Sequence, residues 1–273
     1  LRDVNMIDPF HLEAHGETAI NYNRDVEAFP LLARILGRLM GESPYKSPTD
    51  MGVNRAGFGI VDDTVVQEAA RQEIIRRHFR NRCEYALGLA DSESVRRAAM
   101  LMEEVGVKAE DRSVVLPARA SARECEERGK GNEGAFCGAA VELPDGRIVT
   151  GKNSSLMHAA SAVVLNAIKV LSGIPDRLPL LSPNTIDSIA HLKKDIFTGR
   201  SVSLDLEETL IALAVSAMNN PTAQLAMEHL KDLARCEIHI THIPTPGDDA
   251  GLRRLGVNLT TDANFSTKNL FVS

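Results

Sequence analysis

The sequence predicts an α/β fold in which a mainly helical region, residues 1–110, precedes a layered α/β domain, residues 111–273. Apolar residues recur at helical spacing through most of the first region, which is the pattern of amphipathic helices. Beyond residue 134, strand-like and helix-like segments alternate, as is typical of a sheet covered by helices. Residues 109–134 lose both patterns and predict a domain boundary or a mobile loop at an active site.

The first region is expected to hold a short strand over residues 17–23 and helices over residues 24–41, 62–89 and 92–106. Asp62 or Asp63 can accept hydrogen bonds at the start of the second helix, and Asp91 marks the start of the third. Residues 42–59 are dense in Pro, Gly, Ser and Asn and predict a loop.

The second region begins with a predicted β-hairpin over residues 135–151, whose two apolar runs meet at Pro144, Asp145 and Gly146. An Asp-Gly pair supplies the positive φ that tight hairpin turns need. The elements expected after it are a helix over 156–172, a strand over 178–182, a helix from residue 183, a helical pair interrupted at 219–221, a strand over 236–244, a short helix over 247–256 and a strand over 257–261.

Composition limits the classes of protein that this chain can belong to. The 273 residues carry a net charge of −6 and no tryptophan, which argues against a nucleic-acid partner. No apolar run reaches the roughly 18 residues that span a bilayer, and no signal peptide is evident, so we expect a cytoplasmic protein without a membrane partner. The four cysteines form no C-x-x-C pair and are expected to be reduced and mostly buried.

The first candidate site lies in residues 151–158, where Lys152, Asn153 and Ser154 precede His158 at the start of a predicted helix. A P-loop needs the longer pattern G-x-x-x-x-G-K-[ST], and only its last part is present. Two interpretations stay open. Ser154 or Ser155 can cap the helix, or the helix N-terminus can bind an anion with the help of Lys152.

The second candidate site lies in residues 242–249, between the predicted strand over 236–244 and the short helix that follows. Zinc-dependent nucleotide deaminases place H-x-E after a hairpin and P-C-x-x-C after a later strand. Here the order is the same, so the layout resembles the cytidine-deaminase-like fold. However, Ala160 replaces the proton-shuttling Glu, and Thr245 and Asp248 replace the two thiolates. We therefore expect a deaminase-like scaffold without zinc chemistry and predict no metal ligands.

Further polar side chains complete the set of candidate ligand-binding residues. Arg24 and Lys46 offer donors to phosphate or carboxylate, and acidic residues beside them can accept from a ribose or hold Mg²⁺. The same loops are also compatible with simple turns. The candidate ligand-binding residues are Asn153, Ser154, His242, Thr245, Asp249, Arg24, Asp25, Lys46, Asp50 and Asn54.

Residues 201–213 offer a third, minor interpretation. An apolar run followed by Asp205 and Thr209 is similar to the D-x-D-x-T motif of haloacid-dehalogenase phosphatases, but Glu207 replaces the second acid. A helix N-terminus capped by Ser203 or Asp205 explains the same residues and is the favoured interpretation.

Five long segments, residues 4–32, 45–54, 150–169, 201–213 and 241–260, closely resemble an uncharacterised bacterial family, domain of unknown function 1846. Its members are near twice this length, so the resemblance implies that this chain is the C-terminal portion. The preceding half of such proteins carries a Gly-Ser-Gly-Lys-like loop that is absent here. The resemblance implies no established activity, catalytic residue or cofactor. Some members are labelled ATP-dependent zinc proteases, but this segment has no H-E-x-x-H.

Together these patterns predict an enzyme or binding domain that acts on a nucleotide or phosphorylated metabolite, with the cofactor left open. His158 is the expected acid–base group or oxyanion donor, Lys152 a charge clamp and Asp248 a further catalytic residue. The alternative is a non-catalytic protein that assembles with itself, since many alanines, such as Ala159, Ala212 and Ala214, permit close helix packing. We expect a small phosphorylated ligand or anion as partner and a homo-oligomer.

Overall fold

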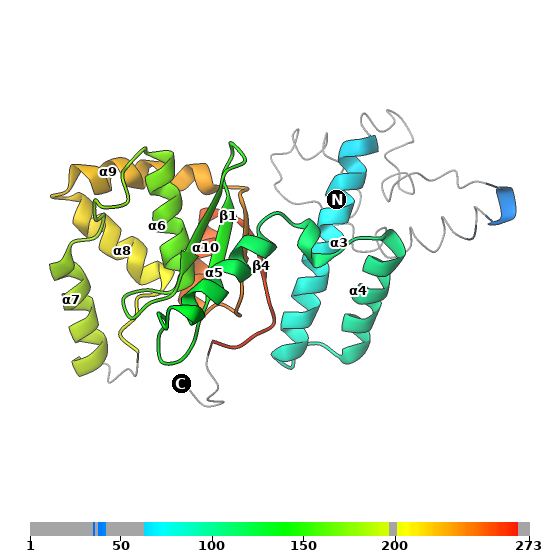
Figure 1. Cartoon of the computed structure of the whole chain (residues 1–273), viewed down its shortest axis with the longest axis horizontal. Coiled ribbons are helices and arrows are strands. Elements are labelled where there is room, and N and C mark those ends of the chain that lie inside the picture. The colour runs from blue at the N-terminus through cyan, green and yellow to red at the C-terminus, as the bar shows by residue number, and fades with distance from the viewer. Residues whose placement is uncertain (1–34, 36–37, 42–62, 197–200, 267–273) are drawn as a thin grey trace, which may run out of the picture. The chain divides into compact units, whose positions relative to one another are not determined.

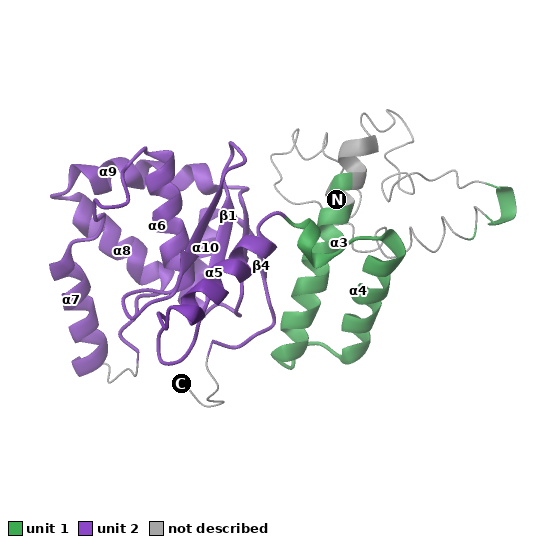
Figure 2. Ribbon diagram, viewed as in Figure 1, with its two compact units in different colours: residues 1–112 green, residues 113–273 purple. Residues whose placement is uncertain are grey.

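The computed structural model describes residues 35, 38–41, 63–196 and 201–266. By compactness the chain divides into two units, residues 1–112 and residues 113–273 (Figure 2). The strand expected over residues 17–23 lies outside the described part, as does the loop expected over residues 42–59.

The described part of the first unit is helical, as predicted. Its elements are α3 (Asp63–Ala86), α4 (Ser92–Val105) and a short 3₁₀ turn, η4 (Ala109–Asp111). The side chain of Asp91 accepts a hydrogen bond from the amide of Ser94, which caps α4 at its start, and Gly106 ends α4 in the left-handed conformation. The predicted helix from Asp91 to Gly106 is therefore confirmed.

The second unit is built on a four-stranded mixed sheet of order β2-β1-β3-β4. Its strands are β1 (Gly138–Glu142), β2 (Ile148–Lys152), β3 (Glu237–Ile240) and β4 (Asn258–Thr261). Strand β1 pairs antiparallel with both β2 and β3, whereas β3 and β4 are parallel. Gly146 has a φ of 82° in the turn between β1 and β2, so the predicted Asp-Gly hairpin is confirmed.

Helices surround this sheet, which makes the unit a mixed α/β structure (Figure 1). In chain order they are α5 (Val115–Glu127), α6 (Ala159–Leu171), α7 (Pro183–His191), the π-helical turn η5 (Leu192–Ile196), α8 (Leu206–Ala217), α9 (Pro221–Glu228), the 3₁₀ turn η6 (His229–Leu233) and α10 (Pro246–Leu255). The helix-and-strand order predicted beyond residue 183 is confirmed by these elements.

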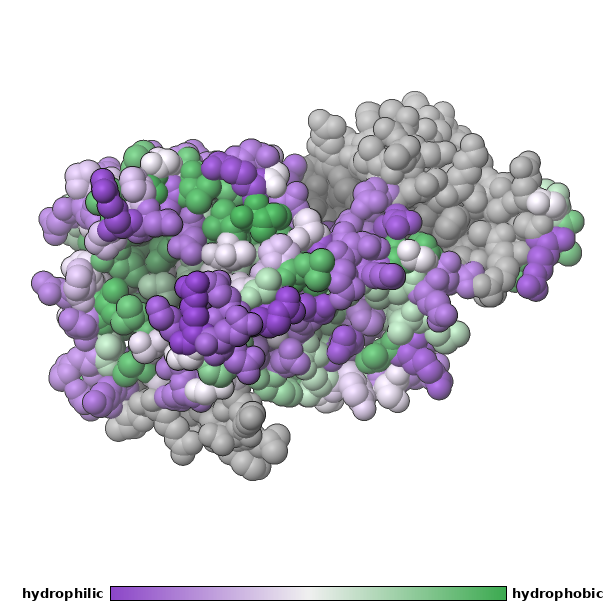
Figure 3. Space-filling model, viewed as in Figure 1, coloured by the Kyte–Doolittle hydropathy of each residue, from purple (hydrophilic) through white to green (hydrophobic). Residues whose placement is uncertain are grey.

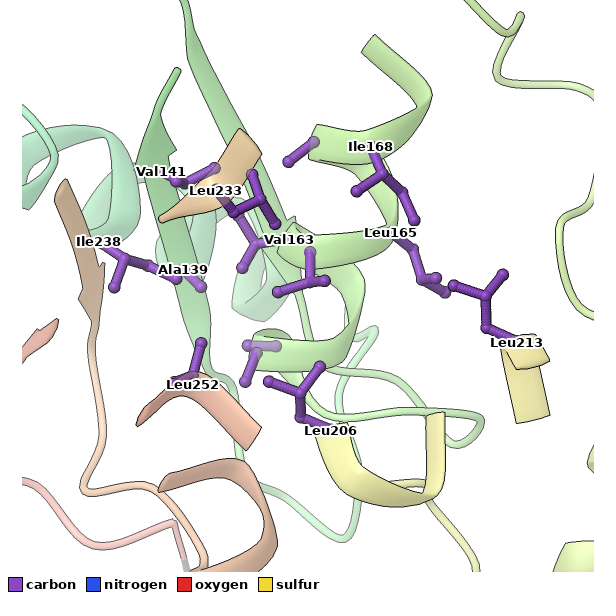
Figure 4. Packing of buried hydrophobic residues seen from close by; sticks show 14 of the residues in the cluster. Ala139, Val141, Val163, Leu165, Ile168, Leu206, Leu213, Leu233, Ile238 and Leu252 are labelled. Atoms are coloured by element: carbon purple, nitrogen blue, oxygen red, sulfur yellow. The ribbon is translucent and has the colours of Figure 1, made fainter. Parts of the chain in front are cut away.

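The main core lies between one face of the sheet and α6, with α8 and α10 beside it (Figure 4). Ala139 and Ile238 point from neighbouring strands toward Val163 on α6, and Leu252 on α10 packs below them. Ala140 points to the opposite face, where it contacts Val114 and Ala118 beside and within α5. The sheet therefore separates α5 from the helices that begin near His158.

A buried ionic network fastens α5 to the ends of the two parallel strands. Arg119 donates two hydrogen bonds to Asp262, from Nε to Oδ2 at 3.0 Å and from Nη2 to Oδ1 at 2.7 Å. His239 Nε2 lies 3.5 Å from Asp262 Oδ2, and Thr260 Oγ1 lies 2.9 Å from His239 Nδ1. Burial raises the pKa of Asp262, but the hydrogen bonds and charges of His239 and Arg119 outweigh it and hold that pKa well below its usual range.

Two secondary-structure predictions were wrong. Residues 115–127, expected to be irregular, form α5, whose buried positions include Val115, Ala118, Ser121 and Cys125. A buried face of small and polar side chains gives a weak apolar periodicity, which explains the error. The strand expected over residues 178–182 is absent. Leu180 and Leu181 are buried there as consecutive residues and have no strand partner in the described part.

The cysteine prediction is confirmed. All four cysteines are free, and those in the second unit, Cys125, Cys137 and Cys236, are buried. Burial raises the pKa of the Cys137 thiol to about 12 and that of Cys236 to about 11, so both are protonated side chains of the core.

Helix α8 has an apolar outer face. Ile211 and Val215 of α8 and Met218, the residue directly after it, recur at helical spacing and are exposed, and Met218 is 80% exposed. Hydrophobic surface is visible at the left of Figure 3, where Figure 1 has α7, α8 and α9. None of the helices in the described ranges is long and apolar enough to cross a bilayer.

Candidate active site

Three helices begin close together in the second unit. The N-cap residues are His158 for α6, Asp205 for α8 and Thr245 for α10. The segments before α6 and α8 run side by side, because Met157 and Leu204 form an isolated parallel bridge and the amide of His158 donates to the carbonyl of Leu204 at 2.9 Å. The positive ends of three helix dipoles therefore meet in one region.

The carboxylate of Asp248 joins the three N-termini. It is buried in the first turn of α10, where Oδ2 lies 2.7 Å from His158 Nδ1 and accepts a hydrogen bond from Thr245 Oγ1 at 2.8 Å. Its second oxygen, Oδ1, accepts a hydrogen bond from the amide of Leu206, the first residue of α8, at 2.9 Å. The carboxylate of Asp248 therefore contacts one group from the start of each helix: the His158 side chain of α6, the Leu206 amide of α8 and the Thr245 side chain of α10.

His158 is oriented by this contact and still accessible. Its side chain is 25% exposed, and the described residues offer no hydrogen-bond partner to Nε2. Burial lowers the pKa of His158, but the hydrogen bond to Asp248 and the charges of Asp248 and Asp205 outweigh burial and raise the pKa above its ordinary value of 6.5. An imidazole held at Nδ1 by a carboxylate and open at Nε2 can donate or accept a proton there.

Asp205 is a second titratable group of the same junction. Its Oδ1 accepts a hydrogen bond from the Glu208 amide at 2.9 Å, and Glu208 Oε2 accepts one from the Asp205 amide at 3.0 Å. This capping box confirms the helix-cap interpretation of residues 201–213 and identifies Asp205, rather than Ser203, as the cap. Burial and the charges of Glu208 and Asp248 raise the pKa of Asp205, although its hydrogen bond from Glu208 opposes them.

Gly247 permits the close approach of Asp205 to α10. A Cβ atom at this position would lie 2.2 Å from Asp205 Oδ2, far inside van der Waals contact. Any larger residue would therefore push Asp205 away from the first turn of α10, which also carries Asp248. This packing explains the glycine directly before Asp248.

The first turn of α6 differs from those of the other helices at the junction. Side chains cap α8 and α10, whereas His158 makes no side-chain cap hydrogen bond to α6. Ala159, Ala160 and Ser161 are buried in that turn. Helix amides without an intrahelical acceptor need another partner, and an anion is one that the helix dipole favours.

The predicted cap by Ser154 or Ser155 was wrong. Ser154 Oγ accepts hydrogen bonds from the amides of Leu156 at 3.2 Å and Met157 at 3.4 Å, so it closes a turn before α6. His158 takes the cap position in extended conformation. The Ser154 hydroxyl, expected to cap α6, instead accepts hydrogen bonds within this short turn.

The structure does not bring Lys152 or Asn153 to His158. Lys152 lies on β2 and forms an ion pair with Glu124 of α5 at 3.0 Å, on the face of the sheet away from α6. Asn153 is buried, and its side chain accepts from the Cys137 amide at 2.8 Å and donates to the Ala135 carbonyl at 2.9 Å. Strand alternation explains the position of Lys152: its neighbour Gly151 lies against Val163 of α6, so Lys152 points to the opposite face.

The remaining candidates are dispersed. His242 contacts the Thr241 hydroxyl at 3.0 Å, and burial lowers its pKa despite the charge of Asp262. Asp249 forms an exposed ion pair with Arg253 on α10 at 2.7 Å. Five candidates lie outside the described residues: Arg24, Asp25, Lys46, Asp50 and Asn54. Within the described ranges, no group of three or more His, Cys, Asp or Glu side chains is arranged to hold a metal ion.

Lys193 is a charged residue near this junction that the sequence did not single out. It lies in the π-helical turn η5, and Nζ donates to the carbonyl of Ser203 at 2.6 Å and pairs with Glu208 Oε2 at 2.7 Å. Its charge opposes the protonation of His158. A single lysine beside the exposed Lys194 carries no sequence signal that could have identified it.

Comparison with known proteins gives two family matches and several relatives. Residues 110–271 match the model described as Domain of unknown function DUF1846, C-terminal, and residues 1–106 match its N-terminal counterpart. The expectation of a C-terminal portion alone was therefore too narrow.

The chain is similar to curated proteins that bear the name UPF0371 protein. It is 50% identical over 273 residues to one from Clostridium botulinum (strain Alaska E43 / Type E3), and 47% identical over 272 residues to one from Clostridium tetani. A relative from Fusobacterium nucleatum is 49% identical over 275 residues. Each alignment covers 99% of this chain and 54% of the relative, so the chain spans about half the length of the curated relatives it matches.

Proposed function

The chain belongs to the DUF1846 family, and from that premise and the geometry of its helix junction we propose that residues 113–273 form an acid–base site for a nucleotide or phosphorylated metabolite. The observation that carries the proposal is the contact between His158 Nδ1 and Asp248 Oδ2 at 2.7 Å. It joins the start of α6 to the start of α10, two segments that lie far apart in the sequence.

The acid–base role follows from the surroundings of His158. Asp248 fixes the imidazole through Nδ1, and Thr245 and Leu206 fix Asp248 in turn. Such a chain of oriented groups is what general acid–base catalysis requires of its histidine. A pKa raised above 6.5 keeps a proton available on the ring closer to neutral pH. Asp205, with its own raised pKa, is the second group that can exchange a proton in this region.

The anionic part of the ligand would lie at the uncapped first turn of α6. Backbone amides and the helix dipole favour negative charge there, and a protonated His158 adds to this. Asp205 and Asp248 oppose a second anion on their side, because they are carboxylates and already occupy the amides of Glu208 and Leu206. The ligand group near Nε2 would therefore be uncharged; it would accept a hydrogen bond from the protonated ring, or donate one to a neutral ring that carries its proton on Nδ1.

We extend the proposal to the scaffold. The order of a hairpin, α6, β3, α10 and β4 supports a deaminase-like arrangement in which α6 and α10 begin at one edge of the sheet. His158, which stands at the position of the deaminase histidine, and Asp248, which replaces one of the two thiolates, bind each other directly. The chemistry proposed for this scaffold is proton transfer by side chains.

A ligand screen tests the proposal. Thermal unfolding of the chain is measured with a panel of nucleotides and phosphate monoesters, for wild type and for His158→Gln. At least one compound is expected to raise the wild-type melting temperature, and His158→Gln should lose most of that response. His229→Gln is the matched control, because His229 Nδ1 also lies 2.7 Å from a carboxylate, that of Asp232. A panel without any stabilising compound, or an equal response in both variants, contradicts the proposal.

A second candidate function is assembly without catalysis, which the apolar outer face of α8 favours. Helices that are apolar on all sides are usually buried, yet Ile211 and Val215 of α8 and the following Met218 are exposed. In this alternative a second copy of the chain covers α8 in a homo-oligomer. The phosphatase alternative has less support, because the Asp205 carboxylate is engaged as a helix cap.

The assembly alternative predicts that Met218→Lys lowers the oligomeric state. A lysine in an apolar interface would lose the hydration of its charge, and this cost would exceed the free energy gained from the remaining apolar contacts. Light scattering coupled to gel filtration measures the mass of wild type, Met218→Lys and the control Met100→Lys, an exposed change on α4. A wild-type monomer, or equal masses for all three proteins, removes this candidate.

A further inference from the structure

Lys193 lies in an unusual piece of backbone beside the helix junction. Residues 192–196 form the π-helical turn η5 directly after α7. Such turns are rare in proteins overall, but those that occur are often found at functional sites. The Lys193 side chain is only 17% exposed, whereas Lys194 next to it is exposed. A lysine is seldom buried to this extent unless its charge is paired.

The two partners of Lys193 belong to the segment that holds the candidate site. Nζ donates to the carbonyl of Ser203 at 2.6 Å, and the next residue, Leu204, accepts hydrogen bonds from the His158 amide at 2.9 Å and from Ser161 Oγ at 3.3 Å. Lys193 therefore holds the backbone of Ser203 and Leu204, to which the first residues of α6 are hydrogen-bonded.

The second partner connects Lys193 to Asp205. Glu208 Oε2 lies 2.7 Å from Lys193 Nζ and accepts the Asp205 amide at 3.0 Å. The ammonium group thus balances the negative charge of the capping box. Three charged groups act on the His158 imidazole: Asp248 of α10 and Asp205 at the start of α8 favour its protonated form, and Lys193 of η5 disfavours it.

We propose that Lys193 is a positioning residue of the His158 site: it clamps the 203–205 segment and supplies the cationic charge that balances the two carboxylates around the imidazole. The inference deepens the proposed acid–base function and rests on it for the catalytic consequence. The placement of Lys193 and its effect on the imidazole can be tested without any ligand. In wild type, the charge of Lys193 lowers the pKa of His158, so that part of the population stays neutral and can accept a proton.

The test is a titration of His158 by NMR in the full chain, with its resonance assigned by comparison with His158→Gln. Lys193→Gln keeps a hydrogen-bond donor and removes the charge, and Lys193→Met removes both. The His158 pKa is expected to shift upward in both variants, because a positive charge that opposes protonation is gone. Lys193→Arg keeps the charge and Lys194→Gln changes an exposed neighbour, so both should titrate like wild type.

The titration separates positioning from a merely structural role. If Lys193→Gln unfolds more easily but leaves the His158 pKa unchanged or lower, the inference is wrong, and an unchanged or lower pKa in Lys193→Met would contradict it in the same way. If Lys193→Met does not fold, Lys193→Gln and Lys193→Arg still decide the outcome. The titration contains no ligand, so a failed ligand screen would overturn the proposed function and leave this result standing.

Discussion

Asp262→Asn is expected to cost about 3 kcal/mol of the free energy of unfolding, the lower end of the cost typical of removing one partner of a buried ion pair, because Arg119 is partly exposed. Asp262 accepts two guanidinium hydrogen bonds from Arg119 and faces the fully buried His239 at 3.5 Å. The asparagine amide replaces one acceptor by a donor. The partly buried guanidinium of Arg119 would then face an uncharged side chain in place of a carboxylate. Denaturant unfolding of the full chain measures the loss.

The pH dependence gives this prediction a sign. Because the folded-state pKa of Asp262 lies below its ordinary value of 3.8, its contribution to stability is present above 3.8 and disappears as the pH falls through the lower folded value. The difference between wild type and Asp262→Asn should therefore shrink in acid. Asp249→Asn, which breaks the exposed pair with Arg253, should change the free energy of unfolding by less than about 1 kcal/mol. Equal losses in the two variants would show that the buried network does not hold α5.

Asp248→Asn is the second change with a large expected effect. It keeps an oxygen for the Leu206 amide but presents an NH₂ group where Oδ2 now meets His158. A protonated imidazole donates at Nδ1 and cannot face that group, whereas a neutral ring with its proton on Nε2 can accept from it. Asp248→Asn should therefore lower the His158 pKa and cost roughly 1.5 to 3 kcal/mol at pH 6, the size of a hydrogen bond to a charged group.

The loss caused by Asp248→Asn should be smaller at pH 8 than at pH 6. A histidine whose folded pKa is raised stabilises the fold fully below 6.5, and this contribution disappears as the pH rises through the folded value. Asp232→Asn is the control, since it removes a carboxylate from the more exposed His229 and should cost less than about 1 kcal/mol. A loss that grows with pH would contradict the assigned charge state of His158.

The sequence predicted most of the elements because their signals are local. Asp-Gly at residues 145–146 required a tight turn, and Asp91 and Asp205 each introduced a helix that the structure confirms. α5 was missed because its buried side is built from Ala118, Ser121 and Cys125, which give little apolar contrast. Its burial depends on contacts with strands that come later in the chain.

The candidate site was predicted in part. The sequence singled out His158 and Asp248, which the structure brings together, and also Lys152, which it turns toward Glu124. Lys152 is six residues from His158 in the sequence, but the strand that carries it points it to the other face of the sheet. Proximity along the chain was a poor guide there, whereas 90 residues separate the two groups that meet.

Asp205 and Lys193 illustrate what a local pattern cannot give. Asp205 was recognised as a helix cap, but its position over Gly247 depends on how α8 packs on α10. Lys193 reaches Ser203 and Glu208 only because a π-helical turn follows α7. Both arrangements are tertiary, and no spacing in the sequence encodes them.

The pKa of His158, measured by NMR titration in wild type and in Asp248→Asn, tests the central claim most directly. The claim is that a buried carboxylate holds this imidazole as an oriented acid–base group. It predicts a wild-type value above 6.5 that falls in Asp248→Asn. A wild-type value at or below 6.5, or one that the substitution leaves unchanged, would contradict this claim.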